Sequence, residues 1–270
     1  MKSSRRIQPW AFAFPTFLLL GLASCVAESD GGLVIQQAQP LTVDGTSCVA
    51  DTDETVYLPR GVVDMAVARN YELFPLIRNN FIDVVAAKGY TAKDTRLNTK
   101  NVSLLRAKVS YHTQDDFSVT LQNRTVPLSA SVGTGGGKTT VSVELLTPAM
   151  IDKFRNSKEF VVIGSQGEVR PARSSVDLSV DVTVEGQTQD GNDVESNTFT
   201  FALRVCNGCL VYYPPQSSSD AGTAPNCLAP EPTSDSINLC GIGWQGSVDC
   251  GTCLAFAPDP LARQLCQPAL

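Results

Sequence analysis

The stretch "VDLSVDVTVEG", residues 176–186, decides the fold class of this chain. Val and Leu occupy every second position from 176 to 184, and Asp, Ser and Thr occupy the positions between them. A period of two is typical of a β-strand with one buried and one solvated face. The stretch "FTFALRV", residues 199–205, alternates in the same way, and the turn signal Asp190-Gly191 lies between the two stretches. Together they predict a pair of antiparallel strands.

Alternation of this kind extends over most of residues 55–205. It recurs in "DFSVTL" (116–121), "TTVSVELL" (139–146) and "VSLLRAKVSYH" (102–112). In the last stretch the phase slips at Leu105-Arg106, which predicts a β-bulge. Seven or more strands separated by turn signals indicate an all-β protein, and we expect an antiparallel immunoglobulin-like β-sandwich.

Two stretches interrupt the alternation. "TPAMIDKFRN" (147–156) predicts one short helix, with Thr147 as its N-cap and Pro148 at its first position. "GTGGGKTT" (133–140) resembles a phosphate-binding loop, but Val132 stands where that motif requires its first glycine. We therefore expect this glycine-rich stretch to be a hairpin loop between two strands.

The N-terminus has the layout of an export signal. A basic start is followed by an apolar stretch and then by small residues, in "MKSSRRIQPWAFAFPTFLLLGLASC". The apolar part is too short for a membrane-spanning helix, which needs about 20 residues. The last four letters, "LASC" (22–25), resemble the lipobox of bacterial lipoproteins. The resemblance implies that residues 1–24 are removed and that Cys25 is lipidated, and Val26 in place of Asp favours the outer membrane.

The remaining chain is acidic. Residues 1–24 contain three of the 21 Lys and Arg residues and none of the 27 Asp and Glu residues, so the mature chain has a formal net charge of −9. That charge argues against binding to nucleic acid or to anionic lipid through electrostatics. We expect a polar tether at residues 25–47, a β-sandwich domain at 48–205 and a small cysteine-rich tail at 206–270.

The cysteines predict a disulfide framework. Nine are present, and eight remain when Cys25 is set aside. Because exported chains meet an oxidising compartment, we expect four disulfides, whose pairing the spacing alone does not reveal. Cys48 stands alone near the start of the domain, so its partner should lie in the tail and join the two ends. The eight residues are Cys48, Cys206, Cys209, Cys227, Cys240, Cys250, Cys253 and Cys266.

Two C-x-x-C pairs, "CNGC" (206–209) and "CGTC" (250–253), allow other interpretations. Together they could form a Cys₄ zinc site, although the segment between them is longer than in most zinc ribbons. A redox pair usually has its first cysteine at a helix N-terminus, whereas Cys206 ends a predicted strand. We therefore favour disulfides that stabilise the tail.

Other chemistry has little support in the sequence. His112 is the only histidine and lies on the polar side of its strand, so we expect it to be exposed. Acidic loops occur at 51–54, 113–116 and 189–195. The last of these offers oxygen ligands for calcium from Asp190, Asn192, Asp193 and Glu195, although solvated turns use the same residues.

The later part of the chain is similar to a group of predicted lipoproteins of myxobacteria. The similarity lies in "GQTQDGNDVESNTFTFALRVCNGCLV" (186–211) and "LCGIGWQGSVDCGTCL" (239–254). It implies a periplasmic or surface lipoprotein and supplies no catalytic residue and no cofactor. We therefore expect a non-enzymatic, membrane-anchored protein with a structural or interaction role and an envelope protein as its partner. The alternatives are an envelope enzyme that uses carboxylates and a carrier of calcium or another ligand.

Overall fold

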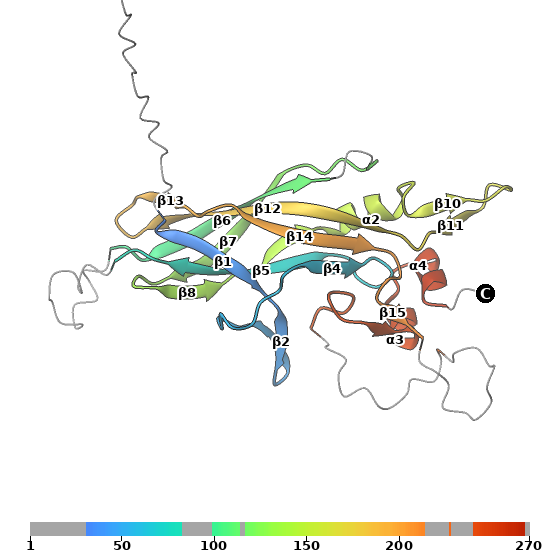
Figure 1. The fold of residues 1–270 in the computed structure, drawn as a ribbon, viewed down its shortest axis with the longest axis horizontal. Coiled ribbons are helices and arrows are strands. Elements are labelled where there is room, and N and C mark those ends of the chain that lie inside the picture. The colour runs from blue at the N-terminus through green and yellow to red at the C-terminus, as the bar shows by residue number, and fades with distance from the viewer. Residues whose placement is uncertain (1–30, 83–98, 114–116, 214–226, 228–239, 268–270) are drawn as a thin grey trace, which may run out of the picture.

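The computed structural model describes residues 31–82, 99–113, 117–213, 227 and 240–267. This part of the chain is mostly β-strand with a few short helices, as the sequence predicted. The larger sheet has six strands, in the order β4 (Gly61–Asp64), β14 (Phe199–Cys206), β12 (Ser175–Thr188), β6 (Val102–His112) and β7 (Arg124–Val132), with β13 (Asp193–Glu195) paired to β12. The smaller sheet has four, β1 (Leu33–Gln39), β5 (Tyr71–Asn79) and β8 (Gly137–Thr140) in order, with β9 (Val143–Leu146) also paired to β5. The long strands run along the long axis of the molecule (Figure 1).

The central hairpin of the larger sheet is the pair that the sequence predicted. β12 and β14 are antiparallel, with Ser175 opposite Cys206 and Val182 opposite Phe199. The bulge in β6 is also present, because its register with β7 shifts between Leu104 and Arg106. The facing position in β12 is Gly186, where a Cβ atom would lie only 2.6 Å from the Ser103 carbonyl oxygen. Glycine therefore permits the close backbone approach at the bulge.

Within the β-domain, one strand pair departs from the antiparallel prediction. β4 lies parallel to β14, with Gly61 opposite Leu203 and Asp64 opposite Cys206. Parallel partners require a long connection, and here most of the domain separates the two strands in sequence. As a result the ends of β4 and β14 lie side by side, which places Asp64 next to Cys206.

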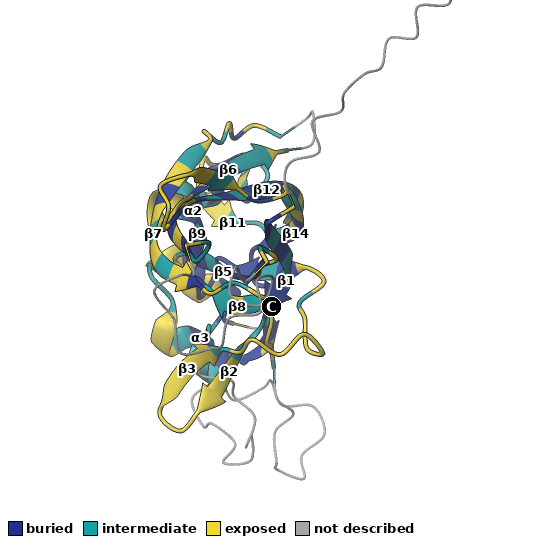
Figure 2. Cartoon of the chain, turned by 90° about the vertical axis from the view of Figure 1, so that its left-hand side faces the viewer, coloured by how far each residue is buried: buried dark blue, intermediate teal, exposed yellow. Residues whose placement is uncertain are grey.

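The two sheets face each other and enclose the core (Figure 2). They are linked along one edge by Asn197, whose side chain accepts a hydrogen bond from the Ile35 amide at 2.7 Å and donates to the Ile35 carbonyl at 3.2 Å. Along the other edge the Tyr111 hydroxyl donates to the Leu145 carbonyl at 2.5 Å. The sheets thus curl toward each other at both edges.

The expected boundaries need two corrections. The tether prediction is wrong for residues 33–47, because β1 pairs with β5 and buries Leu33 and Ile35, and a hairpin follows it. The only continuous apolar run in this polar stretch is at residues 33–35, and three residues are too few to show the period of a strand. The glycine-rich stretch joins β7 to β8, which belong to different sheets, so it is a connection between sheets and no hairpin loop. The hairpin after β1 consists of β2 (Leu41–Asp44) and β3 (Ser47–Ala50).

The helix in the middle of the domain was predicted correctly. α2 (Pro148–Arg155) begins after Thr147, whose side chain accepts a hydrogen bond from the Met150 amide. Pro148 stands at the first helical position, where its missing N–H would have no partner in any case. Ile151 and Phe154 are buried and fix the helix against the core. A small hairpin of β10 (Val161–Ile163) and β11 (Val169–Pro171) follows.

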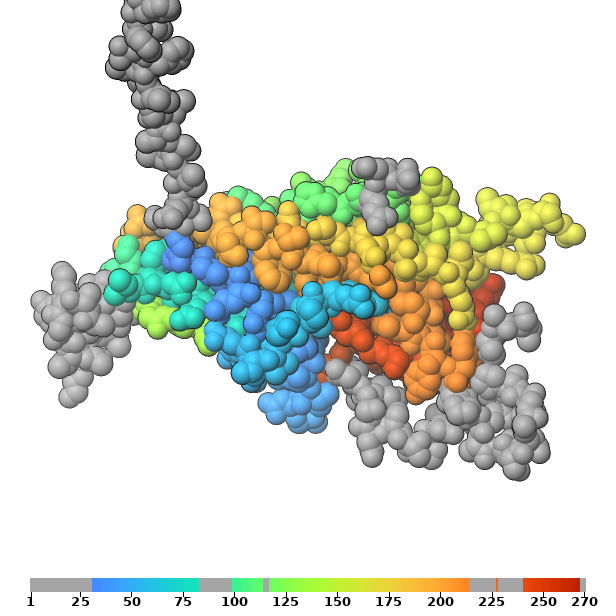
Figure 3. Space-filling model, in the orientation of Figure 1, coloured from blue at the N-terminus to red at the C-terminus, as the bar shows by residue number. Residues whose placement is uncertain are grey.

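The C-terminal tail packs on the end of the domain near β4. It contains β15 (Val211–Tyr212), β16 (Val248–Asp249), α3 (Cys250–Phe256) and α4 (Pro260–Leu265). Its few buried side chains pack on Ala66 and Val67, which follow β4, so the tail has no separate core of its own. In the space-filling view the tail lies directly against the domain surface (Figure 3). In the described ranges we find no helix with the length and apolar character needed to cross a bilayer.

Candidate functional site

The structure pairs the eight cysteines beyond Cys25 into four disulfides. Cys48 has its partner in the tail, as the sequence suggested. The zinc alternative does not fit this arrangement, because each of its four sulfurs is bonded to another cysteine and the two C-x-x-C pairs do not meet. Cys25 and residues 1–24 lie outside the described residues. The bridges are Cys48–Cys240, Cys206–Cys209, Cys227–Cys250 and Cys253–Cys266.

The two bridges at the C-terminal end hold short helices. Cys250 opens α3, which Asp249 caps by accepting a hydrogen bond from the Thr252 amide at 2.8 Å. Cys253 and its partner Cys266 are both completely buried. Because this segment offers little apolar surface, the covalent bonds replace the hydrophobic core that it lacks.

The Cys206–Cys209 bridge has a different environment, because it is built around a buried carboxylate. Asp64 is fully buried at the end of β4, beside Cys206 of the parallel strand β14. Its Oδ1 accepts hydrogen bonds from the amides of Ala66 at 2.9 Å and Gly208 at 2.7 Å. Its Oδ2 accepts one from the amide of Leu210 at 2.8 Å. The side chain of Asp64 thus holds the C-x-x-C turn in place.

The turn itself depends on glycine. Gly208 has a φ of +77°, a left-handed conformation that glycine adopts without strain. That conformation directs its amide at Asp64. Asn207 is also buried, and its side-chain amide donates to the Ala172 carbonyl at 3.1 Å. Every position of the turn from 206 to 208 is therefore fixed by the fold.

One carboxylate oxygen of Asp64 and the sulfurs of Cys206 and Cys209 lie within 4.8 Å of one another. Across the described part of the chain this is the only place where three or more His, Cys, Asp or Glu side chains converge in this way. Cys206 is completely buried, whereas Cys209 is exposed. The bridge therefore has one protected and one accessible end.

Burial changes the protonation chemistry of Asp64. Removal from water raises the pKa of its carboxyl group, because desolvation disfavours the charged form. The amides of Leu210, Ala66 and Gly208, and the charge of Arg173, act in the opposite direction and offset part of this effect. The result is a carboxyl group that holds its proton to higher pH than an ordinary aspartate does.

Sequence reasoning missed Asp64. It follows "GVV" at residues 61–63 and resembles any polar residue at the end of a strand. Its hydrogen-bond partners Gly208 and Leu210 come 144 and 146 residues later. No local pattern connects them, so only the parallel pairing of β4 with β14 could have revealed the site.

The other residues proposed from sequence are dispersed. His112 is exposed on the outer face of β6, where its Nε2 lies 2.8 Å from an oxygen of Asp181. Of the acidic loops, Asp190 pairs with Lys100 at 2.7 Å, and Glu195 lies 3.6 Å from Lys108. These carboxylates face different cations and do not converge as calcium ligands would. Residues 114–116 of another acidic loop lie outside the described residues.

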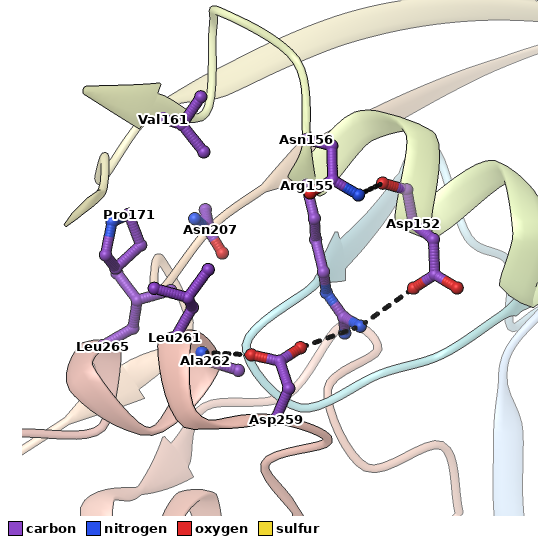
Figure 4. Close-up of a pocket in the computed structure, with 10 residues that line it drawn as sticks. All are labelled: Asp152, Arg155, Asn156, Val161, Pro171, Asn207, Asp259, Leu261, Ala262 and Leu265. Carbon is purple, nitrogen blue, oxygen red and sulfur yellow. Dashed lines mark hydrogen bonds and ion pairs between the residues drawn. The ribbon is translucent and has the colours of Figure 1, made fainter. Parts of the chain in front are cut away.

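A small cavity of about 80 Å³ lies where α2, β11 and α4 meet (Figure 4). Arg155 lies beside it, between Asp152 at 3.4 Å and Asp259 at 3.7 Å. The guanidinium also donates hydrogen bonds to the carbonyls of Met65 and Ala68. Since Arg155 connects α2 to the tail and to the segment after β4, we interpret it as a structural contact and not as a ligand site.

No protein-family model matches the chain, and no curated protein matches it.

Proposed function

We propose that this protein is an exported lipoprotein, anchored through Cys25, whose β-domain acts as a non-enzymatic interaction module. One observation carries the proposal: four disulfides use every cysteine except Cys25. Cytosolic thiols are kept reduced, so a framework of this density fits a protein that folds after export. The lipobox-like "LASC" then gives the remaining cysteine a role of its own.

The position of β1 limits how far the domain can extend from a membrane. Seven residues separate Cys25 from Leu33, the first residue of the sheet. The eight peptide units from Cys25 to Leu33 span at most about 29 Å when fully extended. The anchor that we propose would therefore hold the domain close to the lipid headgroups, on the outer membrane.

We further propose that the two facing sheets work as a rigid sandwich of immunoglobulin-like type that presents its hairpins to an envelope partner. The hairpin of β10 and β11 supports this role. Its side chains Val162, Ile163 and Val169 are exposed, and Ile163 is 70% accessible. Exposed aliphatic side chains on a projecting ribbon are typical of a binding surface and are costly to leave in water.

An enzymatic role has weaker support. Asp152 and Asp259, the carboxylates nearest the cavity, share Arg155 as an ion-pair partner. The Arg155 guanidinium also donates to the carbonyls of Met65 and Ala68, so the three charged side chains connect α2, the tail and the segment after β4. The interaction role is therefore the better match to the geometry.

Metabolic labelling with radioactive palmitate tests the anchor. The full chain expressed in a bacterium should incorporate label and fractionate with membranes, whereas the Cys25→Ser variant should do neither. The Cys206→Ser/Cys209→Ser variant is the matched control, because it also loses cysteine but should label normally. Label that persists in Cys25→Ser would refute the anchor.

Site-specific photo-crosslinking in intact cells tests the interaction surface. A crosslinker at Ile163 should trap a discrete envelope protein. The same group at Leu105, an exposed residue of β6 that is 49% accessible, is the matched control and should trap none. Equal or absent crosslinking at both positions would count against a binding role for the hairpin.

A further inference from the structure

We propose that Cys206–Cys209 is an exchange-active disulfide: a dithiol partner attacks the sulfur of Cys209, and Asp64 supplies a proton to the departing sulfur of Cys206. This activity goes beyond the anchoring and interaction roles above and does not depend on them. It also revises the interpretation of this pair as a purely structural bridge.

The two ends of the bridge are unequal in access. Cys209 is exposed, whereas Cys206 is completely buried at the end of β14. Thiol–disulfide exchange requires the attacking sulfur to approach one end of the bond, so only Cys209 can receive the attack. Cys206 is then always the leaving group, and its sulfur is released next to Asp64.

The Cys206–Cys209 bridge also contributes little to the stability of the fold. Its cysteines are three residues apart, whereas Cys48–Cys240 closes a separation of 192 residues. Stabilisation by a disulfide grows with the length of the loop that it closes. The turn is moreover already held by the three amide hydrogen bonds to Asp64. A purely structural role therefore leaves the bond largely redundant.

Asp64 is placed to serve the leaving sulfur. Its Oδ1 accepts two amide hydrogen bonds, but its Oδ2 accepts only one, which leaves room on Oδ2 for a proton. One of its oxygens lies within 4.8 Å of both sulfurs. Burial favours the protonated carboxyl group, which can then act as a general acid.

The positively charged groups near Asp64 favour its ionised form, but their effect on its pKa is smaller than that of burial. Arg173 lies between β11 and β12, and Arg155 lies on α2; the field of each acts on this carboxyl group. Both are cations and favour the carboxylate, but desolvation is the larger effect on Asp64. Among the described residues, Arg173 and Arg155 are the cations whose electrostatic interaction with the Asp64 carboxyl group is resolved.

The exchange moves two electrons from the partner dithiol to the bridge. A thiolate of the partner forms a bond to the sulfur of Cys209, the bond between Cys209 and Cys206 breaks, and its electron pair goes to Cys206. The proton of Asp64 passes to that sulfur, and Asp64 regains a proton from water. The second thiol of the partner loses its proton to water and attacks the partner sulfur that is bonded to Cys209. The bond between that sulfur and Cys209 breaks, and Cys209 takes its electron pair and then a proton from water. The partner dithiol is oxidised to a disulfide and Cys206 and Cys209 are reduced to thiols, a transfer of two electrons.

Single-cysteine variants of the full chain test the direction of attack. With dithionitrobenzoate as the probe, the Cys209 thiol in Cys206→Ser should react about 100-fold faster than the Cys206 thiol in Cys209→Ser. The reason is that access governs the rate, and only Cys209 is exposed. Equal rates would overturn the assignment of Cys209 as the attacked end.

Exchange with dithiothreitol tests the role of Asp64 in the wild-type chain. Alkylation and mass spectrometry would give the rate of reduction of Cys206–Cys209 at each pH. Division of this rate by the concentration of dithiothreitol thiolate at that pH gives a corrected rate. This corrected rate should fall about tenfold or more as pH rises through the titration of Asp64, since a general acid contributes at least that much. If Asp64 has only a structural role, the corrected rate should not change with pH, and that result would overturn the proposal.

The Asp64→Asn variant gives the second readout. Its side-chain carbonyl can still accept hydrogen bonds from Ala66 and Gly208, but it has no acidic proton to transfer. The corrected rate should be about tenfold lower and independent of pH. Asp177→Asn, at an exposed aspartate that pairs with Arg204 on the outer face of β12, is the matched control and should behave as wild type. If Asp64→Asn does not fold, the pH profile of the wild-type chain still decides the question.

Discussion

Cys48 and Cys240 lie 192 residues apart in sequence, yet a disulfide holds their Cα atoms 5.4 Å apart. The bond joins the exposed β2–β3 hairpin to the tail, and it positions the segment that follows Cys240 against β4. There the Gln245 amide donates to the Val62 carbonyl at 3.1 Å, and the Asp64 amide donates to the Gly243 carbonyl at 2.9 Å. The tail thereby covers an edge strand that would otherwise expose unpaired backbone groups.

Removal of this bridge should release the tail before the domain unfolds. Cys48→Ser/Cys240→Ser should lower the free energy of unfolding by about 4–5 kcal/mol, because the bond closes a very long loop. Trp244 donates from Nε1 to the Asn70 carbonyl at 2.7 Å, so its fluorescence should shift to the red at lower urea than the loss of β-sheet circular dichroism. The Cys206→Ser/Cys209→Ser variant is the control with a short loop and should lose only about 2 kcal/mol. Coincident transitions with unchanged stability would contradict this account.

Arg155 should be essential for stability despite its charge. In Arg155→Met the carbonyls of Met65 and Ala68 lose their buried donor, which should cost about 2–4 kcal/mol. Arg170→Met, at a side chain that is 70% exposed, is the matched control and should change the free energy of unfolding by less than about 0.5 kcal/mol. Urea denaturation of both variants measures the difference, and equal stabilities would show that the Arg155 contacts are dispensable.

Asp190 should titrate well below an ordinary aspartate. Hydrogen bonds from Lys100 and Thr188 lower its pKa to about 2. Because the folded value lies below the unfolded value of about 3.9, its contribution to stability is present above pH 3.9 and is lost as pH falls through about 2. Carbon NMR of the side-chain carboxyl group would measure the pKa.

The matched variants for Asp190 are two lysine substitutions. Lys100→Met removes the largest cause of the shift and should raise the pKa of Asp190, whereas Lys153→Met on α2 should leave it unchanged. An unchanged pKa in Lys100→Met would refute the ion pair. If calcium addition shifted the Asp190 signal at neutral pH, the calcium alternative would regain support.

The N-cap of α2 gives a smaller, local prediction. Thr147→Ala should lower the free energy of unfolding by about 1 kcal/mol, because the Met150 amide loses its acceptor. Thr147→Ser retains the hydroxyl group and should be close to wild type. Chemical denaturation distinguishes the two, and an equal loss in both would show that the methyl group matters more than the cap.

Much of the fold could be predicted because its signals are local. The alternation from Val176 to Val184 defined β12, the phase slip at Leu105 defined a bulge, and Thr147-Pro148 defined a helix start. Each depends on the geometry of a few consecutive residues. The inclusion of β1 in the sheet was missed because its apolar period is short and irregular, with a register shift between Ile35 and Gln37.

The sequence by itself determined that the chain is β-rich, where its one central helix begins and which cysteines are available for bridges, since periodicity, capping and composition are encoded locally. Only the tertiary structure decided which cysteines pair and which carboxylate lies beside them. Asp64 and Cys206 meet because β4 adds to the edge of β14 in parallel, a contact between segments 142 residues apart. Such a contact depends on how the whole core packs, and burial by that packing turned an ordinary aspartate into a candidate proton donor.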